Sequence, residues 1–146
     1  MPKTEPPGLT TRLVAGELLR RRKAAGLSQG QVAEKFTAAG YPVKLAAYAS
    51  IEAGKTRITV DMLTVAADVF GCSPTALLIP PSGESDMIAF QGPGATTAAR
   101  ALAWLRMEMP FLAVDEEDPP LATVLRWQAD AFPSFEIPPA MRGRAT

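Results

Sequence analysis

Histidine is absent from this chain of 146 residues, and cysteine occurs once, as Cys72. The commonest general base and the commonest metal ligand are therefore missing, which excludes zinc sites and Ser-His or Cys-His catalysis. A single cysteine allows no internal disulfide and fits a reducing compartment. An enzyme would have to use carboxylates, Lys or Tyr, and no such constellation is evident. We expect a protein that is not an enzyme and binds no cofactor or metal.

Long apolar runs are also missing. No stretch reaches the roughly 18 apolar residues that a membrane-spanning helix requires. The first ten residues, MPKTEPPGLT, lack the apolar segment of a signal peptide. We therefore expect no membrane association and a cytoplasmic location.

The formal net charge of zero hides a division between the two parts of the chain. Residues 1–60 have a balance of +6, and residues 61–146 have a balance of −6. This asymmetry suggests a polyanion-binding module joined to a differently employed part. Ordinary solvated helix faces are the alternative explanation.

Residues 10–80 show five short helical patterns. The ends are marked by Gly residues and the starts by Ser or Thr, which are good N-caps. The predicted helices run over Thr10 to about Ala25, Gln29 to about Ala39, Lys44 to Ala53, Thr59 to Phe70, and a short segment after Ser73-Pro74. Residues 1–9 read as a flexible N-terminal arm.

Pro80-Pro81-Ser82-Gly83 forms a boundary, and residues 84–146 read as a small, mainly helical C-terminal extension. Met87 to Phe90 could be a short strand, followed by a Gly-Pro-Gly turn. Helices are expected over Thr96 to Met107 and over Leu121 to Ala131. The predicted fold class is all-α.

Gly54-Lys55-Thr56 is how a phosphate-binding P-loop ends. That motif also needs a Gly five residues before the Gly-Lys pair, after a strand, but this position is Ala49 in a helical pattern. Another explanation of the Gly-Lys pair is needed.

Several short motifs together resemble the helix-turn-helix domain of the XRE/Cro repressor family, which is lambda repressor-like. They are Gly26-Leu27-Ser28-Gln29, Val32-Ala33, Ile51-Glu52-Ala53-Gly54-Lys55, Leu63-Thr64-Val65-Ala66, Gly71-Cys72-Ser73 and Leu77-Leu78. The resemblance covers residues 10–79. It implies a DNA-binding transcriptional regulator, a repressor that binds double-stranded DNA as a homodimer and is associated with the nucleoid.

The resemblance also assigns roles to residues. Gly54 would end the recognition helix, which places Lys55 and Arg57 near a phosphate, while Arg22 and Glu52 match an internal ion pair of related repressors. A phosphate contact or a solvated charge is the alternative for Arg22. The residues predicted to contact DNA are Arg22, Ser28, Gln29, Lys44, Leu45, Ala46, Ala47, Ser50, Lys55 and Arg57.

Two features depart from the family pattern. The connection from Thr37 to Pro42 is long, which suggests a long-turn subfamily. The third helix presents mainly Leu and Ala outward, and we expect Tyr48 to lie in the core. Specificity would then rest on backbone contacts and DNA shape, helped by an arm around Lys3, or DNA reading has weakened and the module binds protein.

The part after Pro81 concentrates large apolar side chains. They form either a small core or a contact surface, and Trp104, Leu105 and Trp127 are candidates for a dimer interface. The acidic run at residues 115–118 reads as a solvated cap before a helix, not as a metal or acid-base cluster. The alternative function is an antitoxin-like or phage-type interaction protein whose acidic region binds a protein partner.

Overall fold

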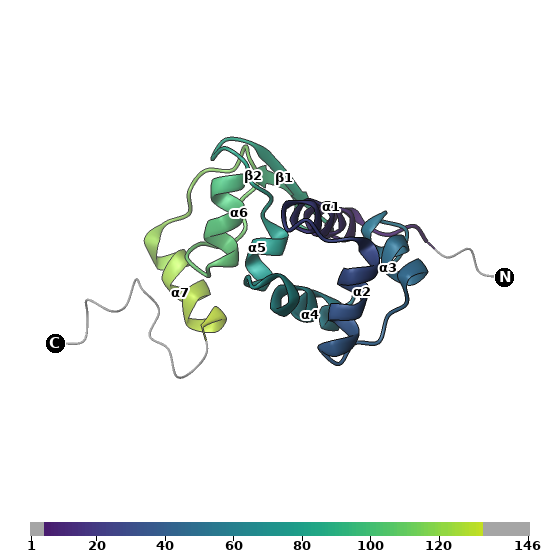
Figure 1. Ribbon diagram of the computed structural model, residues 1–146. Helices are drawn as coiled ribbons and strands as arrows, with labels where there is room; N and C mark the ends of the chain where they lie inside the picture. The colour runs from purple at the N-terminus through teal and green to yellow at the C-terminus, as the bar shows by residue number, and fades with distance from the viewer. Residues whose placement is uncertain (1–4, 133–146) are drawn as a thin grey trace. The chain divides into compact units, whose positions relative to one another are not determined.

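The structure is a computed structural model, and residues 5–132 of it are described. The chain divides into two compact units, Met1–Pro80 and Pro81–Thr146, which are treated separately. Figure 1 labels the helices and strands of both units. Within the described residues, no helix is long and apolar enough to cross a membrane. Residues 1–4, and with them Lys3 of the predicted arm, lie outside the described part.

The first unit is built from five helices: α1 (Leu9–Ala24), α2 (Gln29–Ala38), α3 (Leu45–Glu52), α4 (Val60–Phe70) and α5 (Pro74–Leu78). Three of them begin at the expected caps, because the hydroxyls of Ser28, Thr59 and Ser73 accept a hydrogen bond from the backbone N–H three residues on. The third helix begins one residue later than predicted. Lys44 has an extended backbone and lies at the N-cap without a side-chain cap.

One apolar core holds these helices together. Val14 and Leu18 of α1, Phe36 of α2, Ile51 of α3 and Leu77 of α5 are each at most 2% exposed. The core also contains Val32, Ala33, Tyr48, Ala66 and Ala67. Burial of one Leu or Ile side chain is worth about 1.5–3 kcal/mol, so this core determines how α2 and α3 are held relative to α1.

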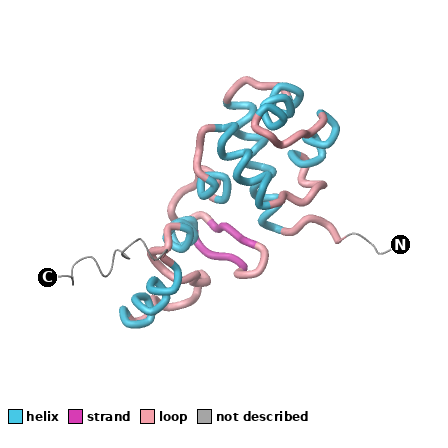
Figure 2. Tube along the Cα trace, turned by 90° about the horizontal axis from the view of Figure 1, so that it is seen from below, coloured by secondary structure: helices cyan, strands magenta, loops and turns pink. Residues whose placement is uncertain are grey.

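The second unit contains a β-hairpin, followed by two helices (Figure 2). Strands β1 (Met87–Phe90) and β2 (Gly94–Thr97) are antiparallel, and Met87 lies opposite Thr97. The turn uses Gly92 and Gly94, both with positive φ. The all-α prediction therefore describes the first unit, whereas the hairpin is an exception to it.

Helix α6 (Ala98–Leu105) packs on the hairpin, and α7 (Leu121–Ala131) follows a loop. The sequence pattern predicted that α6 begins at Thr96. It begins at Ala98 because Thr96 belongs to β2, while the Thr97 hydroxyl accepts a hydrogen bond from the Arg100 N–H. The Gln128 amide group of α7 donates to the carbonyl oxygens of Met107 and Glu108. These two bonds tie α7 to the turn after α6, where Met107 has a φ of 61°.

Candidate nucleic-acid interface

The long connection between α2 and α3 is held by its own hydrogen bonds. The Thr37 hydroxyl donates to the Ala33 carbonyl oxygen at 3.0 Å, and it lies 3.3 Å from the Val43 N–H nitrogen, which donates to it. Gly40, with a φ of 90°, ends α2 in the left-handed region. The extra residues therefore form a defined turn that leads into α3.

Helix α3 has one buried face and one open face. Tyr48 and Ile51 are 0% and 2% exposed, and the Tyr48 ring lies 5.5 Å from the Phe36 ring. This agrees with the prediction that Tyr48 is a core residue. On the open face, Leu45 is 54% exposed, and Lys44, Ala46 and Ala47 are also exposed. These four residues, predicted to contact DNA, lie together at the start of α3.

Arg22 of α1 and Glu52 of α3 form an ion pair. The Arg22 Nη2 and Glu52 Oε1 atoms are 2.6 Å apart, and Arg22 Nε lies 2.9 Å from both carboxylate oxygens. Arg22 Nη1 also donates to the Leu27 carbonyl oxygen at 3.0 Å. The Arg22 side chain is only 14% exposed and the Glu52 side chain 2%. The guanidinium group of Arg22 therefore binds partners inside the domain. This geometry does not fit the alternative that Arg22 contacts a phosphate.

The surroundings of Glu52 favour its charged form. Burial alone would raise the pKa of its carboxyl group, but hydrogen bonds from Arg22, the effect of the Tyr48 hydroxyl and a bond from Gln29 outweigh burial and lower the pKa. The Tyr48 hydroxyl is buried near the carboxylate without full hydrogen-bond geometry. Burial is the main cause that raises the pKa of Tyr48, and the nearby Glu52 raises it further. The Tyr48 hydroxyl therefore stays neutral.

Two further arginines of α1 are also paired within the domain. Glu17 is 2% exposed, and its Oε1 atom lies 2.5 Å from Arg20 Nη2 and 3.0 Å from Arg21 Nε. Sequence reasoning missed Glu17, although its spacing of three and four residues from these arginines on a helix was a usable signal. The basic segment of α1 therefore stabilises the helix and holds fewer free charges for DNA than the sequence suggested.

Gly54 and Lys55 form the end of α3. Gly54 has a φ of 72°, its N–H donates to the Ile51 carbonyl oxygen, and the Lys55 N–H donates to the Ser50 carbonyl oxygen, both at 3.0 Å. This is the hydrogen-bond pattern of a Schellman motif. The segment before Gly54 is a helix and not a strand, so the geometry of a P-loop is excluded here.

Lys55 and Arg57 are exposed just after α3. The Arg57 side chain is 61% exposed, and its Nη2 atom lies 3.8 Å from Oε2 of Glu5, which is itself 89% exposed. Such an open pair contributes little stability. The Arg57 guanidinium group is therefore accessible to another anion.

The remaining predicted DNA contacts are polar side chains with partners inside the domain. The Ser28 hydroxyl accepts from the Gln31 N–H, while the Gln31 side chain accepts from the Ser28 N–H, which makes a capping box. The Ser50 and Thr56 hydroxyl oxygens are 2.8 Å apart. Gln29 Nε2 lies 3.4 Å from Glu52 Oε1, a long contact that leaves this side chain the least constrained of the three.

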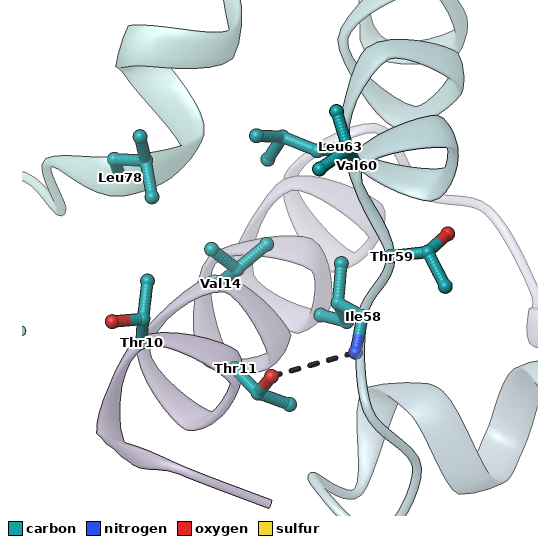
Figure 3. A pocket seen from close by; sticks show the side chains of 8 residues that line it. All are labelled: Thr10, Thr11, Val14, Ile58, Thr59, Val60, Leu63 and Leu78. Carbon is teal, nitrogen blue, oxygen red and sulfur yellow. Dashed lines mark hydrogen bonds between the residues drawn. The ribbon is translucent and has the colours of Figure 1, made fainter. Parts of the chain in front are cut away.

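An apolar hollow lies elsewhere in the first unit, between the start of α1, the start of α4 and the end of α5 (Figure 3). It is lined by Thr10, Thr11, Val14, Ile58, Thr59, Val60, Leu63 and Leu78. The Thr11 hydroxyl accepts from the Ile58 N–H at 3.4 Å. None of these lining side chains is an acid or a base near neutral pH, so the hollow has no group for acid-base chemistry.

In the second unit, the Trp104 ring packs against Phe90 and Phe111, with ring centroids 5.6 and 5.2 Å away. Trp104 therefore has a packing role within its own unit. Leu105 and Trp127, the other candidates for a dimer interface, are half-buried. Their role in dimerisation stays a prediction.

The acidic run folds around Arg100, a residue that sequence reasoning did not single out. The Arg100 guanidinium group donates to the carbonyl oxygens of Ala113 and Glu116 and lies 3.5 Å from Asp118 Oδ1. No acidic residue occupies the first turn of α7. Part of the run is thus a loop fastened to α6 and not only a solvated cap. Within residues 5–132, no group of three or more His, Cys, Asp or Glu side chains could hold a metal ion.

Comparison with known families identifies one match. The family described as Helix-turn-helix matches residues 18–77, which run from late α1 to α5. Comparisons with curated proteins and with solved structures find no match.

Proposed function

We propose that the chain is a DNA-binding regulator that represses transcription as a dimer bound to an operator, because its residues 18–77 match the helix-turn-helix family and form an XRE-type, lambda repressor-like domain. The observation that carries the proposal is the surface of α3. An open helix face begins at Lys44, and Lys55 and Arg57 are exposed at its far end. Cations on both sides of a helix suit the phosphates on both sides of a major groove.

In this proposal each part of the surface has one task. The N–H groups at the start of α2, with Ser28 and Gln29, bind a phosphate, because a helix N-terminus carries partial positive charge. Lys55 and Arg57 bind phosphates on the other side, and residues 44–50 enter the groove. The Arg22–Glu52 ion pair holds α3 at a constant angle to α1. Bound at an operator, the protein would exclude polymerase.

Two copies would read two half-sites about 34 Å apart, one turn of DNA. We propose that residues 84–146 supply the dimer contact. If they bind a different protein instead, the chain would be an interaction protein of the antitoxin type.

The test is binding of the full chain to DNA flanking its own gene, compared with scrambled DNA, over a salt series. A specific complex with a two-fold symmetric footprint is the expected result. Equal binding to both DNAs, or none, would contradict the repressor and direct the search to a protein partner.

Arg57→Ala is the most direct variant. It should weaken binding to all sequences about equally and reduce the salt slope by roughly one unit, because one phosphate contact is lost. Lys35→Ala is the matched control, since Lys35 is an exposed cation of α2 to which no DNA contact is assigned. Loss of sequence discrimination with unchanged overall affinity would disprove the phosphate role of Arg57.

A further inference from the structure

The open face of α3 consists largely of methyl and methylene groups. Leu45 is 54% exposed, Ala46 and Ala47 are exposed, and Ala49 is half-buried. An apolar side chain that stays half exposed to water does not add the full free energy of burial to the stability of the folded domain. Such a face suits a partner that offers apolar groups between charged edges.

Several Gln, Arg, Ser and Thr side chains that lie near α3 have partners inside the domain, and Lys44 is an exposed cation at the start of α3. Adenine is usually read by Asn or Gln and guanine by Arg or Lys. The sequence contains no Asn, and the first unit contains only two Gln. Gln31 belongs to the capping box, Gln29 contacts Glu52, and Arg22 is held by Glu52 and Leu27. The hydroxyls of Thr37 and Ser50 are hydrogen-bonded to the turns that flank α3.

We propose that α3 recognises its operator through the C5-methyl groups of pyrimidines in the major groove. This inference rests on the proposed function. Thymine carries this methyl group, and 5-methylcytosine carries the same group at the same position. Leu45 and the methyl groups of Ala46 and Ala47 cover it, while Lys44, Lys55 and Arg57 bind the flanking phosphates. The charge of these three residues fits DNA as the occupant and not an apolar protein surface. Removing one contacted methyl should weaken binding about fourfold.

The experiment begins with duplexes that the full-length protein selects from a randomised library. Each thymine of the selected site is then replaced by uracil, which lacks only the methyl group. In parallel, each sensitive A·T pair is replaced by G·C with either cytosine or 5-methylcytosine. The proposal expects uracil to weaken binding about fourfold at a few positions, and 5-methylcytosine to exceed cytosine by a similar factor there.

Variants connect the effect to the helix face. In Leu45→Ala, the uracil effect at one position per half-site should fall below about twofold, because the apolar contact is lost. Val60→Ala is the matched control, since Val60 is 78% exposed in the same unit but lies at the start of α4, and it should leave the uracil effects unchanged.

The outcomes separate the two proposals. A selected site at which uracil has no effect at any position overturns methyl readout and leaves the regulator intact. A uracil effect without a 5-methylcytosine effect also overturns it, because the protein would then be sensing the shape of A·T pairs. Failure to select any site contradicts the proposed function itself, and methyl readout with it.

Discussion

At the scale of single residues, buried carboxylates organise the helix-turn-helix unit. Glu17 pairs with two arginines of α1 and Glu52 with one, and both carboxylates are nearly inaccessible to solvent. Such pairs add little net stability when intact, but the loss of one partner leaves a buried charge without compensation. The Arg22–Glu52 pair therefore specifies where α3 lies relative to α1, whereas the Glu17 pairs act within α1.

Glu52→Gln should lower the free energy of unfolding by about 3 kcal/mol near pH 7, because Arg22 would keep its charge without a carboxylate partner. The effect should depend on pH. Because the pKa of Glu52 is lowered in the folded state, its contribution is present above the unfolded pKa of about 4.3 and disappears as the pH falls through the folded pKa.

Urea unfolding of wild type and Glu52→Gln over a pH series measures this difference. Glu34→Gln on the exposed face of α2 serves as the control and should change stability little at any pH. A difference between wild type and Glu52→Gln that stays constant to about pH 3 would show that the ionised carboxylate is not what stabilises the pair.

At the scale of elements, helix ends determine where the candidate interface lies. The start of α2 is fixed by a capping box, and the end of α3 by a Schellman motif. These two ends bring the backbone N–H groups at the start of α2 and the Lys55 side chain next to α3. A change in either end should alter DNA binding without touching a base-reading side chain.

Two glycine substitutions test this. Gly54→Ala should destabilise the domain by about 1 kcal/mol, because Gly54 has a φ of 72° and a side chain there is strained. Gly16→Ala should stabilise it by about 0.5–1 kcal/mol, because Gly16 is an exposed position within α1 with nothing within 4 Å of an added Cβ.

Thermal unfolding and DNA binding of both variants are the measurements. Only Gly54→Ala should also weaken binding, by displacing Lys55. If Gly54→Ala matched Gly16→Ala in both measurements, the left-handed end of α3 would not be important for the interface.

At the scale of the whole molecule, the two units carry different charge and are expected to carry different tasks. We expect the full chain to sediment as a dimer and a chain ending at Pro80 to sediment as a monomer with retained helical circular dichroism. The shortened chain should bind operator DNA far more weakly, because one half-site would act alone. A shortened chain that remains dimeric would locate the interface within residues 1–80.

The sequence by itself determined the helical organisation of the first unit and its resemblance to the helix-turn-helix family. Local signals were sufficient there, because Ser and Thr caps, Gly ends and apolar spacing act within a few residues of chain. Gly54 was predicted to end the third helix, and it follows that helix with a positive φ. The motif spacing also pointed to the helix-turn-helix family that matches residues 18–77.

Only the tertiary structure decided which of the charged and polar residues are free. Arg20, Arg21 and Arg22 look alike in the sequence, but the carboxylates of Glu17 and Glu52 occupy all three. Arg100 looked unremarkable, yet it binds carbonyl oxygens 13 and 16 residues away. The Arg22–Glu52 pair and the Arg100 contacts depend on distances between segments that are far apart in the chain, and local patterns do not contain those distances. The two Glu17 pairs lie within one helix, and their spacing is visible in the sequence. Lys44, Lys55 and Arg57 are exposed near the ends of an apolar helix face, Arg12 is exposed beside Gly54, and the proposal of DNA binding depends on such cations.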